Sequence, residues 1–237
     1  VFQDIVPSIE VRGGIPSDGV WEKTDTGTVW TISVIAPGAK GQRVHFDALD
    51  LPEDAYVIVF NARDPEEAYG PYTSKDVGDS EGLWVSSCFS EEVGVQCVVP
   101  NGVSFEDVHL VIDKIVHIYA GFEDLYWGKA AGSCNLDVTC YSDWQNEAKG
   151  VAGMGTIGQT GMLWCTGALI SDLDPSTQKP FFLTANHCVS NSSQANSLEV
   201  YWFYQTSVCN GSPPSPSSVP RTTGGADYLA GVSHYSG

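Results

Sequence analysis

The chain has 237 residues, an ordinary hydrophobic fraction and a net charge of −18 at pH 7, so one large or two modest domains with packed cores are expected. So acidic a chain repels phosphate backbones, which argues against a nucleic-acid partner. The sequence has no apolar run near the roughly 18 residues of a membrane span, so we expect no membrane partner either.

The first half alternates apolar and polar residues in the manner of half-buried β-strands. The clearest candidate strands are Thr28–Ile35, Arg43–Leu49, Ala55–Phe60 and Val108–Tyr119. A helical turn is expected only near Asp64–Ala68. Several strands at this spacing predict an all-β fold that begins with an antiparallel β-sandwich of jelly-roll or CUB-like kind.

The side chains of these strands carry further expectations. One face of the last strand holds Val108, Leu110, Ile112, Val116 and Ile118, interrupted by Lys114. His45 alternates with the inward residues Val44 and Phe46, so we expect it to face solvent. Aromatic residues that could line a carbohydrate site, although core and edge packing is commoner, are Trp21, Trp30, Trp84 and Tyr69–Tyr72.

Seven cysteines are spread singly along the chain, and none forms a Cys-x-x-Cys pair. A zinc knuckle or a thioredoxin-type site is therefore disfavoured, and disulfides in a secreted protein are expected instead. Cys88 and Cys97 flank a Glu-Glu-Val-Gly sequence that suggests a turn, so they are predicted to staple a hairpin. The odd number leaves one cysteine without a partner in this chain.

Residues 120–133 change in composition, from an aromatic and acidic stretch to the small residues that follow Lys129. We place a domain boundary here. Residues 1–128 would form the β-sandwich, as a prodomain or accessory domain, and residues 129–237 a second β-rich domain.

The sharpest local motif is Phe181-Phe-Leu-Thr-Ala-Asn-His187-Cys188, an apolar strand that runs directly into a histidine. In a serine protease the histidine takes the proton of the nucleophile and later returns it to the leaving amine. Such a histidine must be held rigidly beside a cleft. A strand on one side and a half-cystine on the next residue would provide that rigidity.

Residues 132–237 resemble the N-terminal part of bacterial lysyl endopeptidases, which belong to the trypsin-like serine proteases. The matching blocks, in the same order, are Gly132–Cys140, Cys165–Ile170, Phe181–Cys188 and Val200–Cys209. The resemblance covers less than half of this chain and less than half of a complete protease domain. It implies the first β-barrel of a two-barrel protease, a polypeptide substrate and no metal or organic cofactor.

The resemblance also implies roles for single residues. His187 would be the catalytic general acid and base, held by a Cys165–Cys188 disulfide, and Cys140 would pair with Cys209. The family's first cysteine bridges to the second barrel, so the partner of Cys134 is expected in a C-terminal part that this chain lacks. The odd cysteine then indicates a truncated chain.

The other two triad residues are not recognisable. The sequence holds no Gly-Asp-Ser-Gly or Gly-Ser-Ser-Gly nucleophile motif. The triad aspartate of the family would fall just past the end, with Asp227 as a weak stand-in. We expect this chain alone to be inactive, and lysine preference cannot be transferred because the specificity pocket is absent.

Lys129 stands just before Ala130-Ala-Gly-Ser, where the mature family enzymes begin. Cleavage after Lys129 by a lysine-specific protease would release a family-like N-terminus; the alternative is an ordinary solvated lysine.

The remaining histidines are weaker candidates. His109 and His117 lie eight residues apart on one strand, which separates them by about 26 Å and precludes a shared metal. His234 is expected at the surface. A second hypothesis for the whole chain is a non-enzymatic secreted protein, in which a β-sandwich binding module is joined to a degenerate protease half.

Overall fold

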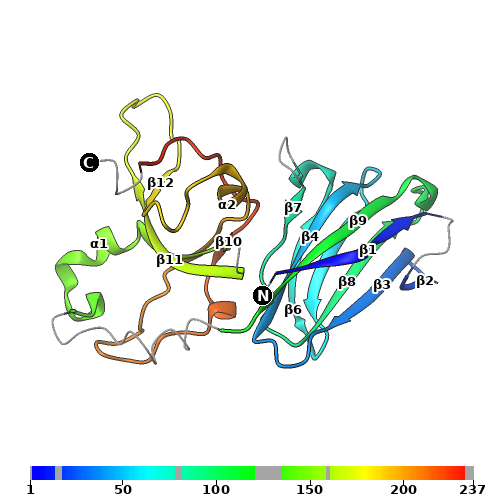
Figure 1. The fold of residues 1–237 in the computed structure, drawn as a ribbon, viewed down its shortest axis with the longest axis horizontal. Helices are drawn as coiled ribbons and strands as arrows, with labels where there is room; N and C mark the ends of the chain where they lie inside the picture. The colour runs from blue at the N-terminus through cyan, green and yellow to red at the C-terminus, as the bar shows by residue number, and fades with distance from the viewer. Residues whose placement is uncertain (1, 14–17, 78–81, 121–134, 159–160, 233–237) are drawn as a thin grey trace. The chain divides into compact units, whose positions relative to one another are not determined.

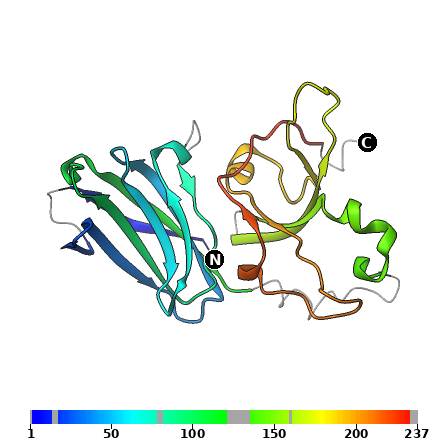
Figure 2. The ribbon, with the colours of Figure 1, turned by 180° about the vertical axis from the view of Figure 1, so that it is seen from behind.

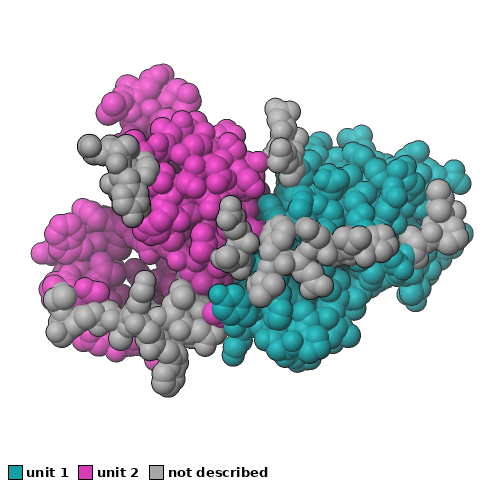
Figure 3. Space-filling model, in the orientation of Figure 1, with its two compact units in different colours: residues 1–119, 159–161 teal, residues 120–158, 162–237 magenta. Residues whose placement is uncertain are grey.

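A computed structural model describes residues 2–13, 18–77, 82–120, 135–158 and 161–232. Its regular structure is mainly β-strand, and the fold class is all-β, as the sequence predicts. The chain divides into two compact units (Figure 3). Unit 1 comprises residues 1–119 and 159–161, and unit 2 comprises residues 120–158 and 162–237. Among the described residues, no helix has the length and apolarity needed to cross a membrane.

Unit 1 is a sandwich of two antiparallel sheets, seen in Figures 1 and 2. Its strands are β1 (Phe2–Arg12), β2 (Val20–Lys23), β3 (Gly27–Ile35), β4 (Gly41–Asp50), β5 (Tyr56–Asn61), β6 (Asp64–Tyr72), β7 (Leu83–Trp84), β8 (Glu92–Pro100) and β9 (His109–Ile118). One sheet has the order β1-β9-β4-β7 and the other β2-β3-β8-β5-β6. With the short edge strand β2 set aside, the remaining eight strands follow the order of a jelly roll.

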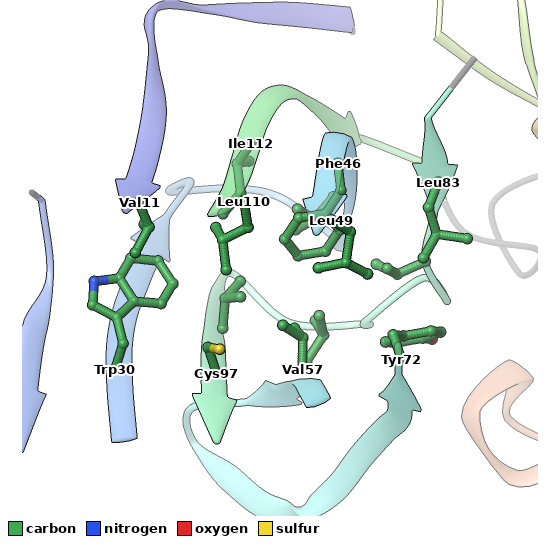
Figure 4. Packing of buried hydrophobic residues seen from close by; sticks show 14 of the residues in the cluster. Val11, Trp30, Phe46, Leu49, Val57, Tyr72, Leu83, Cys97, Leu110 and Ile112 are labelled. Atoms are coloured by element: carbon green, nitrogen blue, oxygen red, sulfur yellow. The ribbon is translucent and has the colours of Figure 1, made fainter. Parts of the chain in front are cut away.

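The core of the sandwich lies between the inner faces of the two sheets (Figure 4). Phe46 and Leu110 from the first sheet face Val57 and Cys97 from the second, and all four side chains are buried. Trp30 is also fully buried, and its indole N–H donates to the Asp18 carbonyl. Burying the tryptophan body while its N–H is bonded favours the core interpretation of this aromatic residue.

The prediction that a disulfide between Cys88 and Cys97 staples a hairpin is wrong. Both residues are buried thiols. The Glu-Glu-Val-Gly sequence enters β8 at Glu92 instead of turning, and Cys97 lies five residues into that strand, about 16 Å from its start. Cys88 forms a bridge with Gln42 of β4, in the first sheet, whereas Cys97 lies on β8, in the second sheet.

His45 is also placed differently from the expectation, because it is 2% exposed rather than facing solvent. The register between β4 and β9 shifts between His45 and Phe46, so that Asp113 is an extra residue on β9 with no Cα partner on β4. The Asp113 carboxylate bonds Nδ1 of His45. Such a bulge turns the following residues to the other face. Ile115, rather than Val116, therefore joins Ile112 in the core cluster between the sheets, although Val116 is buried as well.

The helical turn predicted near Asp64–Ala68 is wrong as well. These residues form the first half of β6, which pairs with β5. Most of their side chains are exposed, so no apolar alternation marks the strand in the sequence.

Unit 2 contains one antiparallel sheet with the order β12-β11-β10-β13-β14. Its elements are α1 (Gln145–Ala148), β10 (Val151–Gly158), β11 (Gly161–Ile170), β12 (Phe181–Thr184), α2 (Ser192–Asn196), β13 (Glu199–Trp202) and β14 (Arg221–Thr222). The outermost strands of this sheet, β12 and β14, are not paired with each other. Among the residues that the structure describes, the sheet is therefore not the closed first barrel that the resemblance implied.

The core of unit 2 is small. Its buried members are Ala152, Met154, Cys188, Leu198 and Val200. Beside it, Glu199 is fully buried and bonds Arg221 on β14 at 3.2 Å and the Tyr201 hydroxyl at 2.9 Å. A buried carboxylate needs such partners, so this group ties the short edge strand β14 to β13.

Candidate active site

His187 lies exposed in a turn that follows β12 directly. The Ala185 carbonyl accepts the backbone N–H groups of Cys188 at 2.9 Å and Val189 at 3.2 Å. These two bonds close the turn around residues 186 and 187. The imidazole therefore stands at the surface on a short, hydrogen-bonded backbone.

Strand β11 supports the turn from one side. It pairs with β12, with Gly167 opposite Thr184, and the Thr184 hydroxyl donates to the Thr166 carbonyl at 2.9 Å. Glycine is needed in the Cys-Thr-Gly-Ala motif because a Cβ at Gly167 would meet the Phe182 ring at 2.2 Å. The ring can thus cross β11 and pack against the core of unit 2.

A disulfide joins the turn to β11. Cys188 is bonded to Cys165, the pair that the resemblance implied, with a sequence separation of 23 residues. Cys188 is buried while its neighbour His187 is exposed. The half-cystine next to the histidine therefore fixes the turn to the sheet without covering the imidazole.

Thr156 on β10 provides a second attachment that the sequence reasoning missed. Its buried hydroxyl donates to the Cys188 carbonyl at 3.0 Å. The sequence did contain a signal for the burial of Thr156. In a strand every second residue points to the same face, and Thr156 follows the buried residues Ala152 and Met154 at that spacing. A hydroxyl at an inward position calls for a nearby acceptor, but the sequence does not say which one.

Ligand atoms of Cys165, His187 and Cys188 lie within 4.8 Å of one another, which by distance alone would suit a metal ion. The two sulfurs, however, are bonded to each other. A cysteine binds zinc as a thiolate, which a disulfide sulfur is not, so only the His187 imidazole would be left to bind. This cluster is therefore a disulfide beside a histidine and does not fit a metal site.

The segment after β14 returns to the histidine turn. The Ala226 N–H donates to the Ala195 carbonyl of α2 at 2.9 Å. A Cβ at Gly231 would approach the Asn186 side-chain oxygen to 2.8 Å, so this segment runs beside the residue that precedes His187. Asp227, the weak stand-in for a triad aspartate, is exposed. Among the described residues, no carboxylate forms an ion pair with His187.

The second disulfide of unit 2 joins Cys140 and Cys209, again the implied pair. Beside it, Asp137 accepts the backbone N–H groups of Thr139 and Asn210 and the hydroxyl of Thr206. These hydrogen bonds, the one from the Thr139 backbone first, lower the pKa of Asp137 to about 2. Lys129, Cys134 and His234 lie outside the described residues.

Comparisons with known proteins match both halves of the chain. A model of the lysyl endopeptidase N-terminal domain matches residues 8–119. A model of the lysyl endopeptidase C-terminal domain matches residues 128–235.

A lysyl endopeptidase of Pseudomonas aeruginosa is 28% identical over 193 residues, which cover 76% of this chain and 40% of that relative. The chain thus spans about two fifths of the length of this curated relative. No solved structure gives a significant match. Because the two family models together cover nearly the whole chain in order, we conclude that it is a lysyl endopeptidase-like protein.

Proposed function

We propose that the chain is the N-terminal part of a secreted serine endopeptidase precursor in which His187 is the catalytic general acid and base. The observation that carries the proposal is the exposed His187 on a turn fixed by the Cys165–Cys188 disulfide, in a chain of the lysyl endopeptidase family. Family membership supports peptide-bond hydrolysis as the reaction and lysine as the preferred residue before the cleaved bond.

The chemistry assigned to His187 is proton transfer. Its imidazole would take the proton of a serine hydroxyl as the hydroxyl attacks the peptide carbonyl, and would then return it to the leaving amine. The serine and the aspartate of the triad would come from residues beyond those in hand, so this chain alone is proposed to be inactive. Exposure of His187 is what a group that must reach a substrate requires.

We further propose that residues 1–128 are a prodomain and that Lys129 is the processing site. The N-terminal family model ends at residue 119 and the C-terminal model begins at residue 128. Lys129 thus stands at the start of the matched protease part. Cleavage after it would separate the jelly roll from the protease.

The first test uses the protein at its full length. It should hydrolyse peptides after lysine and be labelled at a serine by a sulfonyl fluoride. His187→Ala should lower kcat by roughly 10⁴-fold or more, because the serine loses its base. The control His109→Gln changes a histidine of unit 1 and should leave kcat unchanged.

A folded full-length protein that neither hydrolyses peptides nor takes the label would overturn the proposal. It would favour the alternative, a secreted β-sandwich binding module joined to a degenerate protease half. For the processing site, N-terminal sequencing of the secreted protein should give Ala130 as the first residue. Lys129→Gln should prevent that cleavage, and a start far from Ala130 would exclude Lys129.

A further inference from the structure

Thr156 is a polar residue in an apolar setting. It follows Ala152 and Met154 on the inward face of β10, and its side chain is fully buried. A hydroxyl in such a place is destabilising unless it is hydrogen-bonded. The acceptor here is the Cys188 carbonyl, 3.0 Å away and 32 residues further along the chain.

The position of Thr156 along β10 explains why this bond can form. The ladder between β10 and β13 ends where Gly155 pairs with Glu199. Beyond that point the Ile157 N–H donates to the Ser197 hydroxyl at 2.8 Å rather than to a strand of the ladder. The end of β10 is therefore joined by side-chain hydrogen bonds to the segment that follows His187.

Three attachments then converge on the residue next to His187. The Cys188 N–H donates to the Ala185 carbonyl, and its sulfur is bonded to Cys165. Its carbonyl accepts from the Thr156 hydroxyl. The backbone at Cys188 is thereby held at its amide, its side chain and its carbonyl. His187 remains exposed, so its backbone is fixed while its ring is accessible.

We propose that Thr156 is a positioning residue for His187: its hydroxyl holds the Cys188 carbonyl and so keeps the imidazole where it can exchange a proton with the nucleophile. The inference rests on the proposed role of His187. Catalytic groups must be held within about 0.5 Å of the productive geometry. A disulfide alone constrains the Cys188 side chain, and the buried hydrogen bond adds a constraint on the Cys188 carbonyl.

The test compares Thr156→Val with Thr156→Ser in the full-length protein. Valine keeps the shape of threonine but leaves the buried carbonyl without its donor, whereas serine keeps the hydroxyl. In Thr156→Val, kcat should fall by about tenfold while KM changes by less than about twofold, because positioning rather than substrate binding is impaired. Thr156→Ser should restore most of kcat.

Two readouts do not need peptidase activity. The His187 imidazole NMR signals should broaden or split in Thr156→Val and match the unchanged protein in Thr156→Ser. The Cys165–Cys188 disulfide should be reduced several-fold faster by dithiothreitol in Thr156→Val, because its turn opens more often. Should the full-length protein prove not to be a peptidase, these readouts still decide the role of Thr156.

The matched control is Thr206→Val, which removes a threonine hydroxyl that bonds Asp137 beside the other disulfide. It should leave the His187 signals and the reduction of Cys165–Cys188 unchanged.

A measurement on the unchanged protein keeps the inference testable even if Thr156→Val does not fold. The Thr156 hydroxyl proton should exchange slowly enough with water to be seen by NMR. A rapidly exchanging hydroxyl, or a folded Thr156→Val with unaltered His187 signals, reduction rate and kcat, would overturn the inference.

Discussion

At the scale of single residues, Asp137 shows how a surface carboxylate can organise a loop. It lies beside the Cys140–Cys209 disulfide and accepts hydrogen bonds from residues 69 and 73 positions further along the chain. All of these bonds favour the charged carboxylate, which is why its pKa falls to about 2. The loop that ends at Asn210 is thus joined to Asp137 by hydrogen bonds to a charged carboxylate, in addition to the Cys140–Cys209 disulfide.

Because the folded state holds the pKa of Asp137 below its ordinary value of 3.8, the charge stabilises the folded protein at every pH above that value. This stabilisation is lost as the pH falls from 3.8 through about 2. We predict that Asp137→Asn lowers the stability of unit 2 at pH 6 and that the difference from the unchanged protein narrows towards pH 2. The free energies of unfolding of both proteins, measured in urea at pH 6 and pH 2, test this prediction.

The control for this prediction is Asp143→Asn, which removes the same charge from an exposed aspartate whose carboxylate, within the described residues, accepts one long hydrogen bond, from the neighbouring Ser142 hydroxyl at 3.4 Å. Its effect on unfolding at pH 6 should be small. An Asp137→Asn protein that stays equally less stable at pH 2 and pH 6 would contradict the linkage.

At the scale of elements, strands with one apolar face were predictable and strands without one were not. The segments expected at Thr28–Ile35 and Arg43–Leu49 correspond to β3 and β4 within two residues at each end. β6 was missed because its exposed Asp-Pro-Glu-Glu sequence has no inward face in the usual pattern. Its pairing with β5 comes from the rest of the sheet, which a local pattern does not contain.

The candidate site likewise has one part that the sequence predicted and another part that it did not. The motif Phe181–Cys188 and its family resemblance located the histidine turn, because strand, histidine and cysteine are adjacent in sequence. The support from Thr156 depends on a contact across 32 residues, which no spacing rule gives. The burial of His45 likewise depends on the bulge at Asp113, a feature of pairing between two distant strands.

The element β8 gives a direct test of the corrected cysteine assignment. Cys97 lies in the middle of this buried strand, and burial raises the pKa of its thiol to about 12. A thiol with so high a pKa is almost entirely protonated at pH 8 and does not react. We predict that iodoacetamide labels neither Cys88 nor Cys97 in the folded protein and labels both after denaturation without reductant, as read by mass spectrometry.

Cys97→Ala is the matched variant for this prediction. Since both residues are thiols, the labelling of Cys88 after denaturation should be the same with and without Cys97. If a disulfide joined them, Cys88 would be unlabelled in the denatured parent protein and would become labelled in Cys97→Ala. The four cysteines that form disulfides in unit 2 serve as unlabelled internal standards.

At the scale of the whole molecule, the two units are stabilised by different means. Among the described residues, the core cluster of unit 1 holds 20 buried members, and Cys88 and Cys97 are both thiols. The core cluster of unit 2 holds 5 buried members in the part of the chain that the structure describes, and two disulfides close loops across sequence separations of 23 and 69 residues. Loops of these lengths correspond to about 3 and 4 kcal/mol of stabilisation in the loop-entropy description.

Reduction of the disulfides should therefore separate the stabilities of the two units. With dithiothreitol, we predict that backbone amides of β10, β11 and β13 lose protection from hydrogen exchange, while those of β4, β8 and β9 keep it. The expected loss of protection in unit 2 is large because the free energy that each disulfide contributes is a substantial part of the stability of a small domain. Hydrogen exchange read by mass spectrometry, with and without reductant, reports both units in one sample. Joint loss of protection in the two units would mean that their stabilities are coupled, whereas selective loss in unit 2 would show that the apolar core of the jelly roll sustains it without a covalent cross-link.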